Sequence, residues 1–244
     1  MDFICSKDKL LKNINTVSKA VSNKTTMPIL ECILIDVNDN GYKLTGNDLE
    51  LGIETCLTDC KTSEAGSVCL NARMLLDIVR HLPDEDVSIS TDNNYVTIIK
   101  SGKAEFKILG QPSDEFPLIP EIQKNDKLEM FASELKNMIK QTIFSASTDE
   151  SKPILISEYL DIKDDEMNIV AVDGFRVSLR KTKIFTDGDS SSVIVPSKTM
   201  NEISKILPSD AESKVAIYFT DKHALFEMEQ GIVVSRLIEG DYMN

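Results

Sequence analysis

The feature that most constrains this chain is an internal repeat. Residues 27–53 read MPILECILIDVNDNGYKLTGNDLELGI, and residues 152–180 read KPILISEYLDIKDDEMNIVAVDGFRVSLR. A constant shift of 125 residues aligns Pro28 with Pro153 and Asp48 with Asp173 without a gap. The same shift superimposes these further pairs: Leu10 and Leu135, Ile14 and Ile139, Ser67 and Ser192, Ile78 and Ile203, Leu82-Pro83 and Leu207-Pro208. A register kept over so long a stretch is not expected by chance, so the sequence predicts two copies of one domain.

Length and composition agree with two soluble domains of ordinary size. We expect the 244 residues to divide into domains at 1–120 and 127–244, joined by a connector at 110–126 that is rich in proline and acid. Hydrophobic residues make up 41% and charged residues 27% of the chain, which is typical of globular proteins. No apolar run reaches the ~18 residues of a membrane span, and the start MDFICSKDK does not resemble a secretory signal. We therefore expect a cytoplasmic protein.

Hydrophobic periodicity predicts the same order of elements in both copies. Leu10, Ile14, Val17 and Val21 recur at helical spacing and predict a helix with one buried stripe. In each copy a strand, a helix and three strands are expected, followed by the same series again. The expected helices are 7–21, 71–82, 133–146 and 197–206. The predicted fold class is α+β, with a pair of βαβββ units in each domain, helices on one side and antiparallel sheets on the other.

The charge is distributed unevenly between these elements. The chain has a net charge of −13, yet the four helical segments with the first loop (7–24, 71–82, 133–146 and 197–206) contain 11 Lys or Arg and only four Asp or Glu. Lys12 and Lys19 lie on the polar side of the first helix. Lysines also favour solvated helix faces in proteins that bind no polyanion, and this explanation stays open. The distribution favours a basic surface of helices that contacts phosphates without reading bases.

The sequence offers little support for an enzyme. Only two histidines are present, His81 and His223, and both fall at the ends of elements or in turns. No Ser, Thr or Cys lies in a recognisable nucleophile motif, and there is no glycine-rich phosphate loop. Asp48 and Asp173 occupy equal places in the two copies, where bracing a turn is a better explanation than acid–base chemistry. We expect no catalytic residues and no cofactor.

Five cysteines are present, and all of them lie in the first copy. Their positions are 5, 32, 56, 60 and 69. Cys56 and Cys60 are close in sequence, but no second ligand pair follows, so a zinc site is disfavoured. The cysteines read as small buried hydrophobic residues in a reducing compartment, and no metal is expected.

Six segments, in order along the whole chain, resemble one known family. They are MPIL at 27–30, LTGNDLELGI at 44–53, ILGQPSDEFP at 108–117, SASTDESKPIL at 145–155, VAVDGFRVSL at 170–179 and SRLIEGDYMN at 235–244. With these segments the sequence resembles the bacterial DNA sliding clamp, the β subunit of DNA polymerase III. The resemblance implies clamp-type domains arranged as a ring of six, with helices lining a pore around double-stranded DNA. It also implies a non-catalytic role, in which the clamp tethers the polymerase and confers processivity.

The resemblance also implies partners and sites. The implied partners are the DNA polymerase III catalytic subunit, the clamp loader, other clamp-binding peptides and a second copy of the clamp, which forms a homodimer ring when full length. Lys24 corresponds to a basic DNA contact in a loop, and Arg73 and Lys198 are basic at equivalent places in two helices; Lys12 and Lys19 are added from the helical periodicity. The implied partner-peptide pocket has as its wall Leu155, Val172, Gly174, Phe175, Arg176 and Val177. Ordinary strand and turn packing is the alternative explanation for this last set.

The sequence departs from the family pattern at its end. Bacterial clamps have three domains, whereas this chain stops at Asn244, and Tyr242-Met243 stands where the family favours Phe-Pro. We therefore expect clamp domain 1, clamp domain 2 and a third domain that is absent from this chain. A complete two-domain clamp that closes as a trimer is the alternative. A scaffold of clamp-like repeats that binds proteins without encircling DNA is the alternative function.

Overall fold

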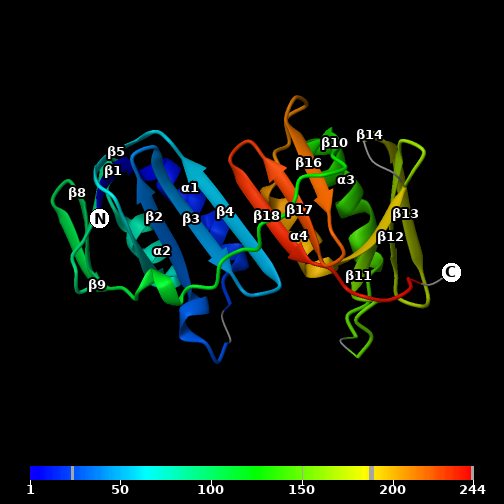
Figure 1. Ribbon diagram of the computed structural model, residues 1–244, viewed down its shortest axis with the longest axis horizontal. Helices are drawn as coiled ribbons and strands as arrows, with labels where there is room; N and C mark the ends of the chain where they lie inside the picture. The colour runs from blue at the N-terminus through cyan, green and yellow to red at the C-terminus, as the bar shows by residue number, and fades with distance from the viewer. Residues whose placement is uncertain (23–24, 150, 187–189, 243–244) are drawn as a thin grey trace. The chain divides into compact units, whose positions relative to one another are not determined.

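The computed structural model describes residues 1–22, 25–149, 151–186 and 190–242 of the chain (Figure 1). It contains two compact units, Met1–Ile119 and Pro120–Asn244. Each unit combines two α-helices with antiparallel strands, so the predicted α+β class is confirmed. Among the described residues, no helix has the length and apolar character required to cross a membrane.

The first unit has two antiparallel sheets and two helices. One sheet has the order β5-β1-β7-β8-β9, and the other has the order β4-β3-β2-β6. Its elements are β1 (Asp2–Ser6), α1 (Lys7–Val17), η1 (Ser18–Ala20), η2 (Pro28–Glu31), β2 (Cys32–Asn38), β3 (Gly41–Asn47), β4 (Leu51–Leu57), β5 (Cys60–Glu64), β6 (Gly66–Asn71), α2 (Ala72–His81), β7 (Asp86–Thr91), β8 (Val96–Ser101), β9 (Ala104–Leu109) and η3 (Ser113–Glu115), where η marks a 3-10 helix.

The second unit repeats this arrangement. Its sheets have the orders β14-β10-β16-β17-β18 and β13-β12-β11-β15. Its elements are β10 (Leu128–Phe131), α3 (Ala132–Thr142), η4 (Ile143–Ser145), β11 (Ser157–Lys163), β12 (Glu166–Val172), β13 (Val177–Lys183), β14 (Phe185–Thr186), β15 (Ser191–Pro196), α4 (Ser197–Ile206), β16 (Lys214–Phe219), β17 (His223–Met228) and β18 (Gly231–Arg236).

The repeat found in the sequence is a structural repeat. A shift of 125 residues carries the bounds of α1 onto those of α3, and it does the same for β2 and β11, β3 and β12, β6 and β15, and α2 and α4. Beyond α4 the shift grows, because the link between α4 and β16 is longer than the link between α2 and β7. The two units therefore share one fold, and differences between equivalent residues carry information about what each unit does.

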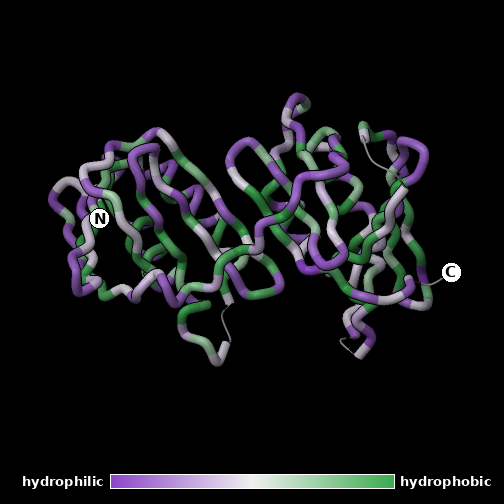
Figure 2. Tube along the Cα trace, viewed as in Figure 1, coloured by the Kyte–Doolittle hydropathy of each residue, from purple (hydrophilic) through white to green (hydrophobic). Residues whose placement is uncertain are grey.

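The helices are held by apolar stripes that face the sheets. Leu10, Ile14 and Val17 of α1 are fully buried, as the periodicity predicts. Side-chain capping fixes the start of α2, where Asn71 Oδ1 accepts a hydrogen bond from Met74 N at 3.1 Å. In α2, Leu75 and Val79 are fully buried, whereas half of the surface of Met74 is exposed. Figure 2 shows the resulting alternation of hydrophobic and hydrophilic residues along the strands of each unit.

Some boundaries differ from the prediction for local reasons. The first helix ends at Val17 and continues as the 3-10 turn η1, where Ser18 Oγ donates to Ile14 O at 2.6 Å. The short strands β5 and β14 were not predicted, because their sequences are polar and lack the alternation of a half-buried strand. Both lie at the edge of a sheet, where one side of the strand has no partner strand and the side chains stay mostly exposed.

Candidate nucleic-acid interface and partner pocket

The two helices of each unit pack against each other and form one layer. In the first unit, α1 contacts α2, and the two helices contact β3, β4 and β6, as Figure 1 shows. Arg80 Nη2 of α2 donates to Asn15 Oδ1 of α1 at 3.3 Å. In the second unit, α3 contacts α4 in the same way. The outward sides of the paired helices therefore form one continuous surface in each unit, which we call the helical face.

Three of the predicted DNA-contact residues are exposed on these helical faces. Lys12 lies on α1, Arg73 on the first turn of α2 and Lys198 on the first turn of α4. Lys19 is half-buried in η1, directly after α1. Lys24 lies outside the described residues. The exposed positions are compatible with phosphate contacts, which require only that a cationic group reaches the nucleic-acid backbone.

Two other lysines of the helices have a structural task instead. Lys7 Nζ donates to Leu82 O at 2.6 Å, and Lys136 Nζ donates to Leu207 O at 2.9 Å. Leu82 and Leu207 are equivalent residues of the two units, each following the last residue of a helix. The two lysines are not equivalent, so the same carbonyl is satisfied from different positions of the neighbouring helix. A cation at this place also interacts favourably with the negative end of the helix dipole.

The charge count of the sequence therefore included lysines that also have structural partners within the protein. Lys7 and Lys136 cap helices, Lys9 pairs with Asp59, and Lys205 Nζ lies 2.6 Å from Glu202 Oε1. Conversely, Arg80 and Lys140 are exposed basic residues of the helical faces that the sequence analysis did not single out. The same helical periodicity that identified Lys12 could have found them.

The six residues predicted for the partner pocket fall into two groups. Leu155 and Val172 belong to an apolar cluster with Ile194 and Tyr242. In this cluster the rings of Tyr159 and Tyr242 are stacked, with centroids 5.1 Å apart and an interplanar angle of 9°. The cluster gives one apolar wall, formed by β11, β12, β15 and the segment that follows β18.

The second group forms the turn between β12 and β13. Gly174 has φ +92°, a backbone conformation that glycine adopts readily in a turn. No other atom lies near the position that a Cβ would occupy. Phe175 is fully exposed, and Val177 exposes 67% of its surface. Arg176 is exposed beside them, held by Asp173. Exposed apolar side chains at a rigid turn are suited to contact a partner.

Asp173 fixes this turn, as the sequence predicted. Its Oδ1 accepts hydrogen bonds from Phe175 N at 3.0 Å and Arg176 N at 3.1 Å, and its Oδ2 accepts one from Arg176 Nε at 2.8 Å. In the first unit, Asp48 Oδ1 accepts from the equivalent amides of residues 50 and 51, at 3.1 and 2.8 Å. The backbone N–H of Phe175, followed by the other donors, lowers the pKa of Asp173 below its usual range. The structural role of both aspartates is confirmed.

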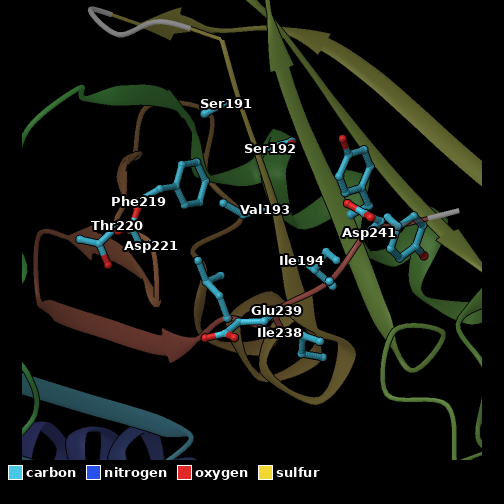
Figure 3. Close-up of a pocket in the computed structure, with 14 residues that line it drawn as sticks. Ser191, Ser192, Val193, Ile194, Phe219, Thr220, Asp221, Ile238, Glu239 and Asp241 are labelled. Atoms are coloured by element: carbon cyan, nitrogen blue, oxygen red, sulfur yellow. The ribbon is translucent and has the colours of Figure 1, made fainter. Parts of the chain in front are cut away.

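A pocket of about 720 Å³ lies beside the apolar cluster in the second unit (Figure 3). It is lined by residues of β15, of the turn after β16 and of the segment 237–242, and it shares Tyr159, Ile194 and Tyr242 with the cluster. None of the six residues predicted for the partner pocket is part of this lining. Within the part of the chain that the structure describes, no three His, Cys, Asp or Glu side chains are placed to hold a metal ion.

Comparison with known protein families accounts for both units. The model of the DNA polymerase III beta subunit N-terminal domain matches residues 1–120, and the model of the central domain of the same subunit matches residues 129–244. The chain belongs to the DNA polymerase III beta subunit family. The recognition made from the sequence is thus confirmed.

Individual beta subunits are similar over the whole chain. The chain is 38% identical to the beta sliding clamp of Bacillus subtilis over 250 residues, which covers 99% of the chain and 66% of that protein. A crystal structure of a putative DNA polymerase III beta subunit from Eubacterium rectale is 46% identical, with a TM-score of 0.95. The sliding clamp structure from Bacillus subtilis is 37% identical, with a TM-score of 0.96. The chain covers 66% of the length of each of these structures, and each covers all of the chain.

Proposed function

We propose that this chain is part of a DNA sliding clamp that encircles duplex DNA without sequence specificity and has no catalytic activity of its own. Its partners would be the DNA polymerase III catalytic subunit, a clamp loader and other proteins with clamp-binding peptides. The observation that carries the proposal is the helical face, on which Lys12, Arg73 and Lys198 are exposed in a chain of net charge −13.

The sign of the charge on each side supports this proposal physically. DNA phosphates attract the cations of the helical faces, while the acidic remainder of each unit repels them. Lysines on helices neutralise phosphates without contacting base edges, so the resulting binding depends on salt and ignores sequence. Contacts of this kind let a clamp move along the duplex.

Ring formation is supported by apolar residues at two sheet edges. In the first unit, the edge strand β9 exposes 74% of Leu109 and 37% of Phe106. In the second unit, the edge strand β13 exposes 67% of Val177 and 59% of Leu179. Unpaired strand edges with exposed apolar side chains favour pairing with another domain. We expect these edges to be covered in a ring of six domains, with a third domain in each full-length protein and two copies in the ring.

Tethering would act through effective concentration. A partner peptide held at the turn of Phe175 and at the wall formed by Leu155 and Val172 would keep the polymerase next to the DNA that the ring encloses. The second binding event then becomes intramolecular, which raises processivity without tighter contacts between polymerase and DNA.

Charge reversal on the helical faces tests the proposal. In a chain carrying Lys12→Glu, Lys19→Glu, Arg73→Glu and Lys198→Glu, we expect binding to a short duplex to weaken strongly. The slope of log K against log salt is negative, and its magnitude should decrease by about 0.9 for each phosphate that the protein no longer neutralises. Fluorescence anisotropy of a labelled duplex over a salt series measures both quantities.

A matched control reverses four exposed lysines that lie in the strands or in the turn between β8 and β9. The variant Lys61→Glu, Lys103→Glu, Lys107→Glu and Lys163→Glu has the same net charge as the test variant. If both variants lose binding equally, only the net charge matters and the helical face has no special role. An unchanged salt slope in the helical-face variant would favour the scaffold that binds proteins without encircling DNA.

A further inference from the structure

Cys5 and Cys60 lie directly opposite each other on neighbouring strands. Cys5 is in β1 and Cys60 begins β5, and the antiparallel register pairs the two residues. Residues that are directly opposite in an antiparallel pair have their side chains on the same face of the sheet, with Cβ atoms about 4.5–5.5 Å apart. A disulfide needs Cβ atoms roughly 3.5–4.5 Å apart, so an approach of about 1 Å brings the two thiols into bonding geometry.

The position of β5 permits that approach. It is the edge strand of its sheet, and β1 is its partner there. Most of its side chains are exposed, so a small shift of β5 toward β1 disturbs little packing. β1, in contrast, is paired on its other side with β7, where Cys5 lies opposite Val87.

We propose that Cys5 and Cys60 form a redox-sensitive pair, which is reduced in the resting protein and is converted by a hydroperoxide into an intramolecular disulfide between β1 and β5. This inference goes beyond the clamp function and does not depend on it. All five cysteines are free thiols in the structure.

The two thiols have different roles in this reaction. Cys5 is buried, and burial raises the pKa of its thiol to about 12, so it stays protonated and is shielded from oxidant. Cys60 is half-buried and is the sulfur that a peroxide can reach. Hydrogen peroxide transfers one oxygen to the Cys60 sulfur and releases water, which leaves a sulfenic acid. The Cys5 sulfur attacks the Cys60 sulfur, the S–O bond breaks, and the hydroxyl leaves as water with the Cys5 proton.

The other cysteines are less suited to this chemistry. Cys32 and Cys69 are buried and are not opposite each other, since Cys32 pairs with Asn71 and Cys69 with Leu34. Burial raises the pKa of Cys69 to about 12 and that of Cys32 to about 11. Cys56 is exposed, but it lies opposite Lys43 on a strand of the other sheet. They therefore serve as internal controls.

Treatment of the native chain with hydrogen peroxide tests the proposal. We expect the free thiols to fall from five to three, with a mass loss of about 2 Da for the two hydrogens that leave. Cleavage at Asp59, which separates Cys56 from Cys60 in the sequence, allows a peptide map to show that Cys5 is joined to Cys60. A thiol reductant should restore all five thiols. Thermal unfolding of the first unit should rise by on the order of 5–10 °C in the oxidised chain.

Serine variants decide between the possible outcomes. Cys5→Ser should leave Cys60 as a sulfenic acid that dimedone traps, and Cys60→Ser should keep Cys5 reduced. Cys56→Ser should form the disulfide as the unaltered chain does. A linkage of Cys60 to Cys56, a native chain that keeps five thiols, or oxidation of Cys60 beyond sulfenic acid without a link to Cys5 would each overturn the proposal.

Discussion

Thr142 Oγ1 lies 2.5 Å from Glu158 Oε1 in the core of the second unit, where both side chains are fully buried. The other carboxylate oxygen, Oε2, has no hydrogen-bond partner among the described residues. The equivalent pair of the first unit is Val17 and Ile33, which are also fully buried. The second unit thus places a hydroxyl and a carboxyl group where its repeat has two aliphatic side chains.

The hydrogen bonds of Thr142 indicate that Glu158 carries a proton. The single hydroxyl proton of Thr142 faces three acceptors: Met138 O at 2.9 Å, Ile139 O at 3.2 Å and Glu158 Oε1 at 2.5 Å. Thr142 donates to Glu158 when the carboxyl group is ionised, whereas a protonated Glu158 has an O–H of its own that can donate to Thr142 and leave the Thr142 proton to the helix carbonyls. Burial accordingly raises the pKa of Glu158 to about 8, against the smaller opposite effect of Thr142.

We predict that the second unit loses stability as the pH rises from about 4.5 to about 8. Below pH 4.5, Glu158 is protonated in both the folded and the unfolded state, so it adds no pH dependence to the free energy of unfolding. Between these values the unfolded chain releases the proton while the folded chain keeps it, so the free energy of unfolding falls with pH. The total is on the order of a few kcal/mol, and urea unfolding at a series of pH values measures it.

Glu158→Gln should remove this pH dependence, since glutamine does not titrate. The matched control is Glu212→Gln, which alters an exposed carboxylate and should leave the slope unchanged. Equal slopes in the unaltered chain and in Glu158→Gln would show that Glu158 is ionised in the folded protein.

The repeat itself suggests how the second unit can be stabilised. We predict that Thr142→Val with Glu158→Ile, which copies Val17 and Ile33, raises the free energy of unfolding by about 1–3 kcal/mol at pH 8. The reciprocal change Ile33→Glu should destabilise the first unit by at least as much, because it buries a carboxyl group with no hydroxyl beside it. A loss of stability in the double variant would mean that the two aliphatic side chains do not fit the second core.

The sequence predicted those parts of the fold that leave a periodic pattern of buried residues, and it missed those that depend on tertiary contacts. The repeat located both units and four helices, because Leu10 and Leu135, or Ile14 and Ile139, keep both the spacing and the burial of a core stripe. The edge strand β5 was not found, since its pairing with β1 comes from tertiary contact and leaves no alternation in its sequence. The burial of Glu158 was not predicted either, because a glutamate in a strand normally indicates an exposed position.

The roles of the candidate-site residues stay predictions, but the structure shows where each described residue lies. Lys12, Arg73 and Lys198 are exposed on helices. Periodicity predicted this place for Lys12, whereas Arg73 and Lys198 were expected from the family resemblance. Sequence could not separate them from Lys7 and Lys136, whose partners are carbonyl groups more than 70 residues away in the chain. The resemblance placed Phe175 in the wall of the partner pocket, but the full exposure of its side chain became evident only from the structure.

We predict that Asp173→Ala destabilises the second unit, because two backbone amides of the turn lose their acceptor. Asp173→Asn should cost less, since an amide oxygen still accepts from Phe175 N and Arg176 N. The pKa of Asp173 is lowered in the folded state, so its contribution is present at neutral pH and is lost as the pH falls through the folded value. Chemical unfolding at pH 7 and at pH 3 measures both effects.

Asp48→Ala provides the matched comparison in the first unit, where the same two amide contacts exist and a leucine, Leu51, stands at the position of Arg176. If the turn contacts dominate, the two substitutions lower the denaturant midpoint to a similar extent. If Arg176→Ala lowers the stability as much as Asp173→Ala does, the stabilisation comes from the ion pair instead.

Lys7 and Lys136 should affect stability and leave DNA binding intact. We predict that Lys7→Met costs about 1–3 kcal/mol, because Leu82 O loses its donor in a buried place and the ion pair with Asp84 at 2.7 Å is removed. Lys136→Met should cost about 1 kcal/mol, since its contacts with Leu207 O and Ser209 Oγ are closer to solvent. Lys140→Met, an exposed residue of the same helix, should change stability by less than about 0.5 kcal/mol and weaken duplex binding instead. Denaturant unfolding and fluorescence anisotropy on the same three variants separate lysines that stabilise helices from lysines that bind a polyanion. A variant that loses stability and duplex binding to the same extent would contradict this division.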